Sequence, residues 1–386
     1  MKTGEDMTEK ALEKFHENDV KPALDEALVH LEEDFQQNKD ALKKLFLNSF
    51  KEICTNIKEV STNREEVEKT THSKTGFIIY TLLRTRILQH KYVYKVIVYD
   101  KDWYLNEGLS VGELDVSFFY KHFEGLWQKL MKASKKYVLK ISEIDVEHIM
   151  LDHLDDFHKY VVELMRYSLI DAVETEEYFA IEKEEILEIQ SGEYYEPCDI
   201  IHMEHKEKNY KKIRKWLEEK ERQSYCFQDF RGIDLKNLEY KNSDLRYTDF
   251  RDSQLDGLDL TTSLLIGTKF KNSSMIGTNL MVSMIHGANF EKADLTGAKL
   301  QYCVAFTGKN EANAWKKTGF TGVSFKDSIL KKANFTGATI IAANFLGADL
   351  TDAIFDEAKL YRSKFTKDQL EKVKLTKEQL EQIEII

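Results

Sequence analysis

The sequence predicts a two-domain protein, in which a mainly helical N-terminal half is followed by a C-terminal solenoid. In the first half, apolar residues recur at the three- and four-residue spacing of amphipathic helices. From Phe230 onward an apolar residue instead returns every five positions, a period that fits neither a helix nor a flat strand. With 386 residues, the chain is long enough for two or three domains, each with its own core.

The composition excludes several classes of protein. Hydrophobic residues make up 42% of the chain, and no apolar run is long enough to span a bilayer. The N-terminal residues lack the apolar stretch of a signal peptide, so we expect a cytoplasmic protein without a membrane segment. The four cysteines lie far apart without a CxxC pair, which is typical of reduced thiols. They are Cys54, Cys198, Cys226 and Cys303.

We expect residues 1–205 to form a mainly helical domain with a small β-hairpin. Residues 77–88 and 92–100 are rich in β-branched and aromatic side chains and flank a short QHK, which predicts the hairpin. A helix is the alternative for residues 77–88. Elsewhere apolar residues follow helical spacing, and the QQNKD between the first two helical segments is either a break or an exposed turn of one long helix. The helical segments are residues 24–35, 42–57, 117–136 and 145–172.

One helix of this domain, rich in histidine and carboxylates, offers candidate metal ligands. His148, Asp152 and Asp155 would share a face at positions i, i+4 and i+7 of a helix over residues 145–172, which is a conceivable metal geometry. A solvated helix face explains the same residues, because apolar residues of that helix lie opposite them. We favour this second interpretation.

Two further features of this half have a structural explanation. The pair Trp103-Tyr104 follows the predicted hairpin, and we expect it to pack in the core or against the other domain rather than to hold a ligand. The acidic run over residues 173–189 predicts a helix with a solvated face, and a surface that binds a partner is the alternative. We find no phosphate-binding glycine loop and no recognisable nucleophile and base, so we predict no catalytic residue, no cofactor and no metal.

The second half begins with a connecting helix and continues as a repeat. Residues 206–229 are rich in strong helix formers, and we expect them to connect the domains and cap the solenoid. Steps of five from Phe230 reach fifteen apolar residues in succession up to Leu300, and the pattern resumes from Phe320 to Phe365. Two positions before each apolar residue the side chain is mostly small. A solenoid buries both positions and leaves the other three in solvent.

This pattern resembles the pentapeptide-repeat family, whose consensus is A-(D/N)-L/F-x-x, over residues 230–365. The resemblance implies a right-handed, quadrilateral β-helix with four pentapeptides in each coil. Like residues should then recur every twenty positions, and the phenylalanines do so. The predicted core ladder is Phe230, Phe250, Phe270, Phe290, Phe325, Phe345 and Phe365.

The five-residue pattern is interrupted once, after Leu300, and ends before the C-terminal residues 366–386. The ladder stays in phase if Phe320 takes the slot directly after Leu300, which leaves fifteen extra residues. We expect residues 304–318 to bulge as a loop that contacts a partner, with Trp315 folded back onto the rod as the alternative. Residues 366–386 contain TK(D/E)QL twice and predict short helices over the open end. The candidate partner contacts are Asn310, Trp315, Lys316 and Lys317.

The family resemblance also implies a function. Its fluoroquinolone-resistance members are acidic rods that mimic B-DNA and bind type II topoisomerases, often as dimers through a C-terminal helix. That implies gyrase binding and a homodimer through residues 366–386. However, residues 230–365 hold 18 basic and 15 acidic residues, whereas residues 1–229 hold 34 and 47. A DNA mimic needs its negative charge on the rod.

We therefore expect a non-enzymatic scaffold of the bacterial cytosol, whose rod and loop present a surface to an unknown protein partner. We expect no direct binding of nucleic acid and no membrane association. The alternative is a DNA-mimic protein that binds a type II topoisomerase such as gyrase. An enzyme with its site in the N-terminal domain is the third class.

Overall fold

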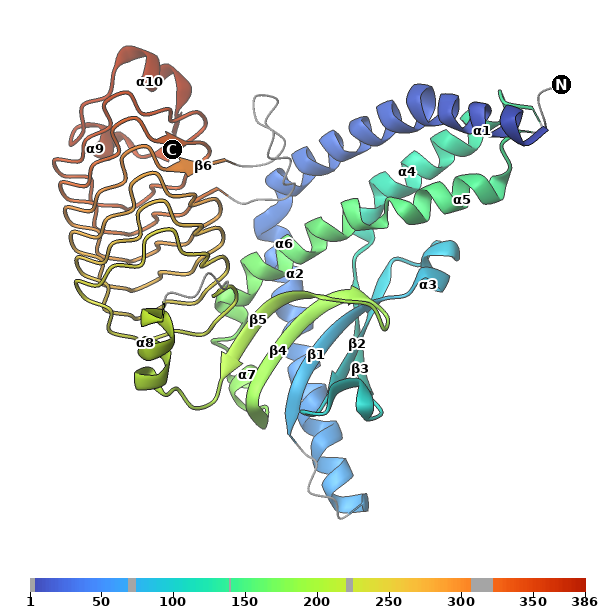
Figure 1. Ribbon diagram of the computed structural model, residues 1–386, viewed down its shortest axis with the longest axis horizontal. Helices are drawn as coiled ribbons and strands as arrows, with labels where there is room; N and C mark the ends of the chain where they lie inside the picture. The colour runs from blue at the N-terminus through green and yellow to red at the C-terminus, as the bar shows by residue number, and fades with distance from the viewer. Residues whose placement is uncertain (1–3, 69–73, 139, 220–224, 307–321) are drawn as a thin grey trace. The chain divides into compact units, whose positions relative to one another are not determined.

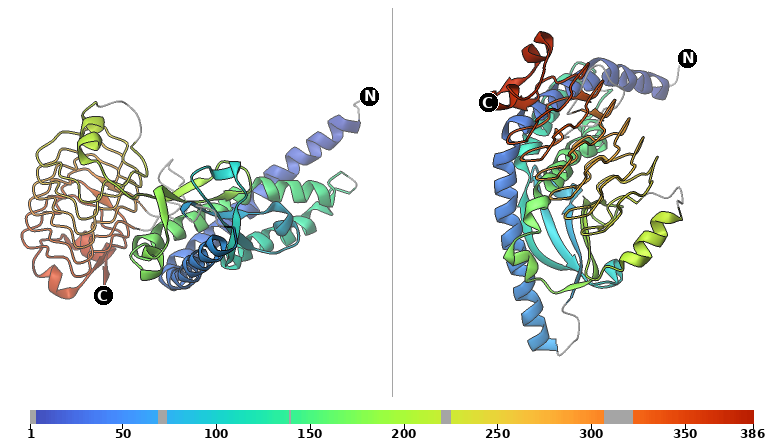
Figure 2. Two further views of the ribbon diagram at one scale, coloured as in Figure 1. Left: turned by 90° about the horizontal axis from the view of Figure 1, so that it is seen from below. Right: turned by 90° about the vertical axis from the view of Figure 1, so that its left-hand side faces the viewer.

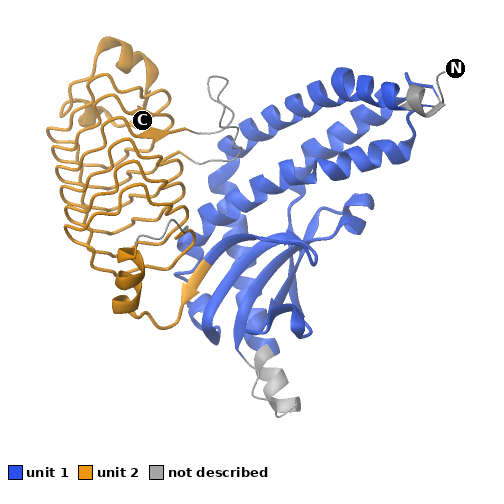
Figure 3. Cartoon of the chain, viewed as in Figure 1, with its two compact units in different colours: residues 1–202 blue, residues 203–386 orange. Residues whose placement is uncertain are grey.

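The computed structural model describes residues 4–68, 74–138, 140–219, 225–306 and 322–386 (Figure 1). The chain divides into two compact units, residues 1–202 and 203–386, which Figure 3 colours separately. No helix in the described part of the chain combines the length and apolar character needed to cross a membrane.

Helices form one layer of the first unit. The segment QQNKD, which the sequence left open, continues the long helix α2 without a break (Figure 2). Leu31 and Phe35, one turn apart, are fully buried, as the helical spacing requires. A short π-helix over His16–Val20 joins α1 to α2. The helices are α1 (Gly4–Phe15), α2 (Lys21–Glu68), α4 (Ser117–Ser134), α5 (Glu143–Asp152), α6 (Leu154–Ala172) and the short α7 (Glu176–Phe179).

A five-stranded sheet forms the second layer and is larger than the predicted hairpin. Strands β1 and β2 do form an antiparallel pair, with Phe77 opposite Tyr99. The helix alternative holds only for α3 (Arg84–Leu88), at the end of the segment. The sheet order is β3-β2-β1-β4-β5, and β4 runs parallel to β1. The strands are β1 (Thr75–Leu82), β2 (Val93–Tyr99), β3 (Leu109–Asp115), β4 (Lys183–Glu193) and β5 (Asp199–His205).

The prediction of one acidic helix over residues 173–189 is wrong. Only α7 is helical there, and the rest of the run enters β4. Leu187 and Ile189 alternate into the core and are 1% and 0% exposed. The acidic side chains between them hide the two-residue period, because they raise the helix propensity of a segment that tertiary pairing makes a strand.

The predicted helix over residues 145–172 is also divided. It breaks at His153, which ends α5 and precedes α6. Trp103 and Tyr104 pack as expected, in a small cluster on the sheet face opposite the main core. The Trp103 ring stacks on Phe77 with ring centroids 5.4 Å apart.

The second unit is a stack of coils that begins near Tyr225. Parallel bridges join residues twenty apart, such as Asp229 to Asp249, and repeat from coil to coil. Each coil therefore contains four pentapeptides. The central residue and the small residue two places before it both point inward, so Leu295 and Ala293 are fully buried. Small side chains are needed at the second position because the interior is narrow.

The phenylalanines of one side form a continuous stack through the array. Successive ring centroids lie 5.5, 5.6, 5.0, 5.1, 5.0 and 4.7 Å apart. All the rings but the first pair are close to parallel, within 20°. The stack consists of Phe230, Phe250, Phe270, Phe290, Phe325, Phe345 and Phe365.

The register of the coils changes once. Met284 pairs with Val304, twenty residues later, but Asn289 pairs with Ser324, thirty-five residues later. Fifteen additional residues therefore lie between Ala305 and Phe325. The prediction that Phe320 takes the slot after Leu300 is wrong, because the strand β6 (Val304–Ala305) continues the coil and pairs with β7 (Thr339–Ile340).

The reason for this error is the size of one residue. Ala305 fills the central position, where Leu245, Leu265 and Ile285 stand in the preceding coils, and it is only 1% exposed. The predicted bulge over residues 304–318 thus starts too early. Residues 307–321, which include Phe320 and most of that segment, lie outside the described residues.

Both ends of the array are closed by helices. At the first end α8 (Tyr210–Glu218) packs Leu217 and its neighbours on the array core. At the second end α9 (Lys367–Leu370) and α10 (Lys377–Gln382) precede β9 (Glu384–Ile385), which pairs with β8 (Lys364–Phe365). This last segment keeps the twenty-residue register, since Lys364 lies opposite Glu384.

Candidate protein-binding surface

The twenty-residue register aligns the pentapeptides in four columns, which we call the sides of the array and which differ in the chemistry of their outward residues. The third side is built on Leu280 and Leu300 and the residues twenty positions from them. In the coil around Leu280 its outward residues carry no charge. Two side chains of this side, Val282 and Tyr302, are 51% and 54% exposed, and Ile276, at the end of the adjoining second side, is 45% exposed. We call Ile276, Met281, Val282, Gln301 and Tyr302 the third-side patch.

The backbone under this patch is held in a costly conformation. Val282 and Tyr302 occupy the second turn position of their pentapeptides, with φ of 59° and 58°. Asn242 takes the same place at φ 58° in the first coil, and Gly337 at 66° in a later one. Asparagine and glycine adopt positive φ at low cost, whereas a β-branched valine or a tyrosine adopts it at a higher cost. Both side chains are therefore exposed to solvent at a backbone position where glycine or asparagine would be more stable.

The patch can bind but has no groups for chemistry. Its side chains are apolar, aromatic or amide, and the patch contains no carboxylate, histidine, thiol or amine. The hydrogen bond from Val282 N–H to the Gln301 carbonyl, 3.0 Å, fixes two neighbouring coils against each other. A rigid, uncharged surface with an exposed aromatic ring has the composition of a protein-contact centre.

The surface around the patch carries more acidic than basic residues. The second side is built on Leu255 and Met275 and the residues twenty positions from them, and the outward positions of the second and third sides together hold nine acidic and five basic residues. Lysines reach the next coil and neutralise part of this excess: Lys241 Nζ lies 3.3 Å from Asp259, and Lys331 Nζ lies 3.3 Å from Asp349. The acids are Asp234, Glu239, Asp256, Asp259, Asp294, Asp349, Asp352, Asp356 and Glu357.

A buried carboxylate lies at the base of the array. The side chain of Asp229 is fully buried and accepts bonds from the Arg231 guanidinium at 2.8 and 2.9 Å. Lys208 Nζ lies 2.8 Å from Asp229 Oδ1. Burial alone would raise the pKa of Asp229, but Arg231 and Lys208 outweigh it and hold this pKa well below its usual range.

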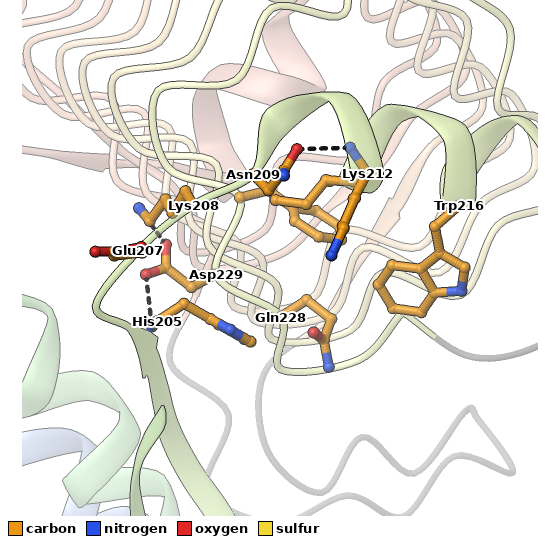
Figure 4. A pocket seen from close by; sticks show the side chains of 10 residues that line it. His205, Glu207, Lys208, Asn209, Lys212, Trp216, Gln228 and Asp229 are labelled. Carbon is orange, nitrogen blue, oxygen red and sulfur yellow. Dashed lines mark hydrogen bonds and ion pairs between the residues drawn. The ribbon is translucent and has the colours of Figure 1, made fainter. Parts of the chain in front are cut away.

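Beside Asp229 a cavity of about 320 Å³ opens between α8 and the first coil, and we call it the cap pocket (Figure 4). Ile213, Trp216 and Phe230 form its apolar walls. Polar groups reach it from three segments: His205 at the end of β5, Lys212 of α8 and Gln228 of the first coil. Nothing in the sequence pattern indicated this cavity, because the residues belong to segments up to 25 positions apart.

The structure places the predicted site residues as follows. Asn310, Trp315, Lys316 and Lys317 lie outside the described residues. His148 and Asp152 lie on α5 and Asp155 on α6, so these three do not share one helix face. Among the described residues no group of three or more His, Cys, Asp and Glu side chains is arranged to hold a metal.

The third-side patch was missed by sequence reasoning. The sequence does contain an indication of it, because valine and tyrosine occupy a turn position where asparagine, aspartate and glycine are more common. The five-residue pattern draws attention to the buried positions and away from this one.

Comparison with known proteins identifies the repeat. Residues 263–301, 320–356 and 328–366 match a family profile described as pentapeptide repeats, in eight copies. The second unit contains pentapeptide repeats. The profile matches no part of the first unit, and nothing in this match indicates a catalytic family. No curated protein matches the chain.

Solved structures of other pentapeptide-repeat proteins are also similar. The protein Rfr23 of the cyanobacterium Cyanothece 51142 is 15% identical over 39% of this chain and 95% of its own, with a TM-score of 0.25. A protein of the Arabidopsis thaliana thylakoid lumen is 26% identical over 33% and 71%, with a TM-score of 0.20. QnrB1, a plasmid-mediated fluoroquinolone resistance protein, is 14% identical over 42% and 88%, with a TM-score of 0.25.

Proposed function

We propose that this chain is a non-enzymatic protein-binding scaffold of the bacterial cytoplasm, and that its pentapeptide-repeat array presents the third-side patch to a protein partner. The observation that carries the proposal is the exposure of Val282 and Tyr302 at strained turn positions. We also infer that the coils form the right-handed, quadrilateral β-helix that the repeat pattern implies. Such a stack supplies a rigid surface, so little conformational entropy is lost on binding.

The energetics favour a partner over solvent at this patch. An apolar side chain of this size gains about 1.5–3 kcal/mol when it is moved from water into a packed interface. Tyrosine is enriched at the centres of protein interfaces, where its ring adds contact area at a low cost in side-chain entropy. Val282 and Tyr302 are adjacent on neighbouring coils, so one partner side can cover both.

The test uses a double substitution that removes the apolar surface without adding strain. Asparagine already occupies the equivalent position at Asn242 and Asn272, both with positive φ. We expect V282N/Y302N to fold normally and to bind the partner at least tenfold more weakly. Partners are captured from a bacterial lysate with the full chain, identified by mass spectrometry, purified, and titrated against both proteins.

A matched control lies one coil away. Thr262 is the neighbour of Val282 in the same column, with φ 59°, so T262N makes the same kind of change outside the patch. Its affinity should equal that of the wild-type chain. Equal affinity of V282N/Y302N and the wild type would refute the proposal, and so would an equal loss in T262N.

A topoisomerase-binding DNA mimic is the second candidate. The acidic excess on the second and third sides favours it, whereas the lysine pairs between coils reduce the phosphate-like potential. The same purified chain decides between the two. A type II topoisomerase among the captured partners, together with altered supercoiling by gyrase at micromolar concentrations of the chain, would support the mimic. Unaltered supercoiling would exclude it.

A further inference from the structure

We propose that the cap pocket binds a small planar organic anion, of the class of aromatic carboxylates. The cavity of about 320 Å³ is large enough for a ligand with one or two fused rings. It lies at the base of the pentapeptide-repeat array and shares no residue with the third-side patch. The inference therefore goes beyond the proposed scaffold function.

Four charged side chains line the cap pocket, Glu207, Lys208, Lys212 and Asp229, and Figure 4 shows the Glu207 carboxylate on the side away from Lys212. Asp229 lines the cavity, but Lys208 and Arg231 already neutralise its carboxylate. Lys212 is different. Its backbone N–H bonds to Asn209 Oδ1 at 3.0 Å, yet in the described part of the chain no hydrogen bond or ion pair engages its ammonium group. Lys212 is exposed to solvent like Lys211, but its side chain lines the cavity beside apolar walls, where a cation attracts an anion more strongly than one surrounded by water on all sides.

Two further donors lie around the same space. Figure 4 shows the Lys212 ammonium, the His205 ring and the Gln228 amide around the centre of the pocket. Within the described residues the His205 ring makes no hydrogen bond. The bond between His205 and Asp229 is donated by the backbone N–H of His205. Among the described residues, the one hydrogen bond of the Gln228 side-chain amide is a long one, 3.5 Å, to the Cys226 carbonyl. Three donors without strong partners suit the two oxygens of one carboxylate.

The apolar walls select a flat ligand. The Trp216 ring is held edge-to-face by Tyr225, with centroids 4.7 Å apart, and by Phe230 at 6.1 Å. Its orientation is therefore fixed before a ligand arrives. Figure 4 shows the indole beside the opening at the far side from His205. A ring system can stack on the indole while its carboxylate reaches Lys212 and Gln228.

The experiment titrates 1-naphthoate into the full-length chain by isothermal titration calorimetry. We expect one saturable site and at least tenfold weaker binding in K212M, because methionine keeps the stem of the side chain but removes the charge. Lys211 is the matched control, since it is an exposed neighbour on α8 that does not line the cavity. K211M should bind as the wild type does. Circular dichroism confirms that each variant is folded.

A neutral probe of the same shape separates charge from apolar burial. We expect 1-naphthamide to bind at least tenfold more weakly than 1-naphthoate. Equal binding of the two probes, an equal loss in K211M and K212M, or no binding of naphthoate at millimolar concentration would each overturn the proposal. V282N/Y302N should retain naphthoate binding, so failure of this site is distinguishable from failure of the scaffold function.

Discussion

At the scale of single residues, the second turn position of the pentapeptide controls the surface of the array. In the described coils this position has positive φ, whichever residue fills it. Aspartate, asparagine, lysine and threonine are all accepted there, so the fold tolerates side chains at a moderate energetic cost. The cost of a side chain at a given position then depends on the residue that lies next to it in the neighbouring coil. Gly267 lies under the ring of Tyr247, whereas Gly277 has open space around it.

This difference predicts the effect of two glycine substitutions. G277A should lower the free energy of unfolding by about 1 kcal/mol, because alanine must adopt a left-handed backbone. G267A should lower it by at least about 1 kcal/mol more. Its added Cβ would collide with the Tyr247 ring, which stacks on Phe227 with centroids 5.0 Å apart.

Urea unfolding of the full chain, followed by circular dichroism, measures both free energies. G277A is the control for backbone strain alone. Equal losses in the two variants would show that the Tyr247 ring moves away at no cost.

At the scale of elements, the two C-terminal helices close the array by means of glutamine side chains. Gln369 Nε2 donates to the Phe345 and Ala348 carbonyls at 2.6 and 2.8 Å. Gln379 Nε2 donates to the Phe355 and Ala358 carbonyls, both at 2.8 Å. Within the array, carbonyls such as that of Ala338 accept from the backbone N–H of the next coil. The glutamine amides thus replace the donors of a coil that does not follow.

Removal of one of these amides should open the end of the array. Q379L leaves the Ala358 carbonyl buried without a donor and also removes the bond that Gln379 Oε1 accepts from Thr376 N–H. A buried unsatisfied group costs about 1–3 kcal/mol, so we expect a loss of that size in the free energy of unfolding. Urea denaturation measures it.

The neighbouring substitution E378L is the control. Glu378 is exposed on the same helix, and its change should stay within about 0.5 kcal/mol. If Q379L and E378L unfold at the same urea concentration, water or a rearranged backbone satisfies the carbonyl.

The elements also show what a sequence can reveal. The five-residue period predicts the array because every repeat independently buries its own central residue. The error at Phe320 arose because Ala305 fills a central position and looks like a break in the pattern. Strand β4 was missed because its pairing with β1, more than a hundred residues earlier, decides its structure. The cap pocket could not be predicted either, because it forms only where α8 packs on the first coil, a tertiary contact that the local sequence does not reveal.

At the scale of the whole molecule, both units depend on ionised carboxylates. Hydrogen bonds from Lys121 and His122 hold the pKa of Asp34 below its usual range in the first unit. In the second unit, burial opposes ionisation of Asp229 and Asp244, but their arginine partners keep both pKa values low. A depressed carboxyl pKa adds stability above the unfolded pKa of about 4, and this stability is lost as the pH falls toward the folded pKa.

We therefore expect the melting temperature to change little between pH 7 and pH 5 and to fall steeply below about pH 4. D229N should melt at a lower temperature at pH 7, because Lys208 and Arg231 lose their buried counter-charge. Its melting temperature should then fall less between pH 5 and pH 3, since one acid-sensitive group is gone. Differential scanning calorimetry across this range tests both statements. Parallel curves for D229N and the wild type would contradict the assignment to Asp229.

The unbroken twenty-residue register of the C-terminal cap makes the length of the array adjustable. A whole coil could be removed or duplicated without turning the cap relative to the coils before it, whereas the loss of a single pentapeptide would rotate every later side by a quarter turn. Evolution can therefore set how far a binding surface extends in steps of one coil, while the closing glutamines keep the same carbonyls to satisfy. The thirty-five-residue step at Asn289 shows a second freedom, since fifteen residues are added between two pentapeptides without a change in the register of the later coils.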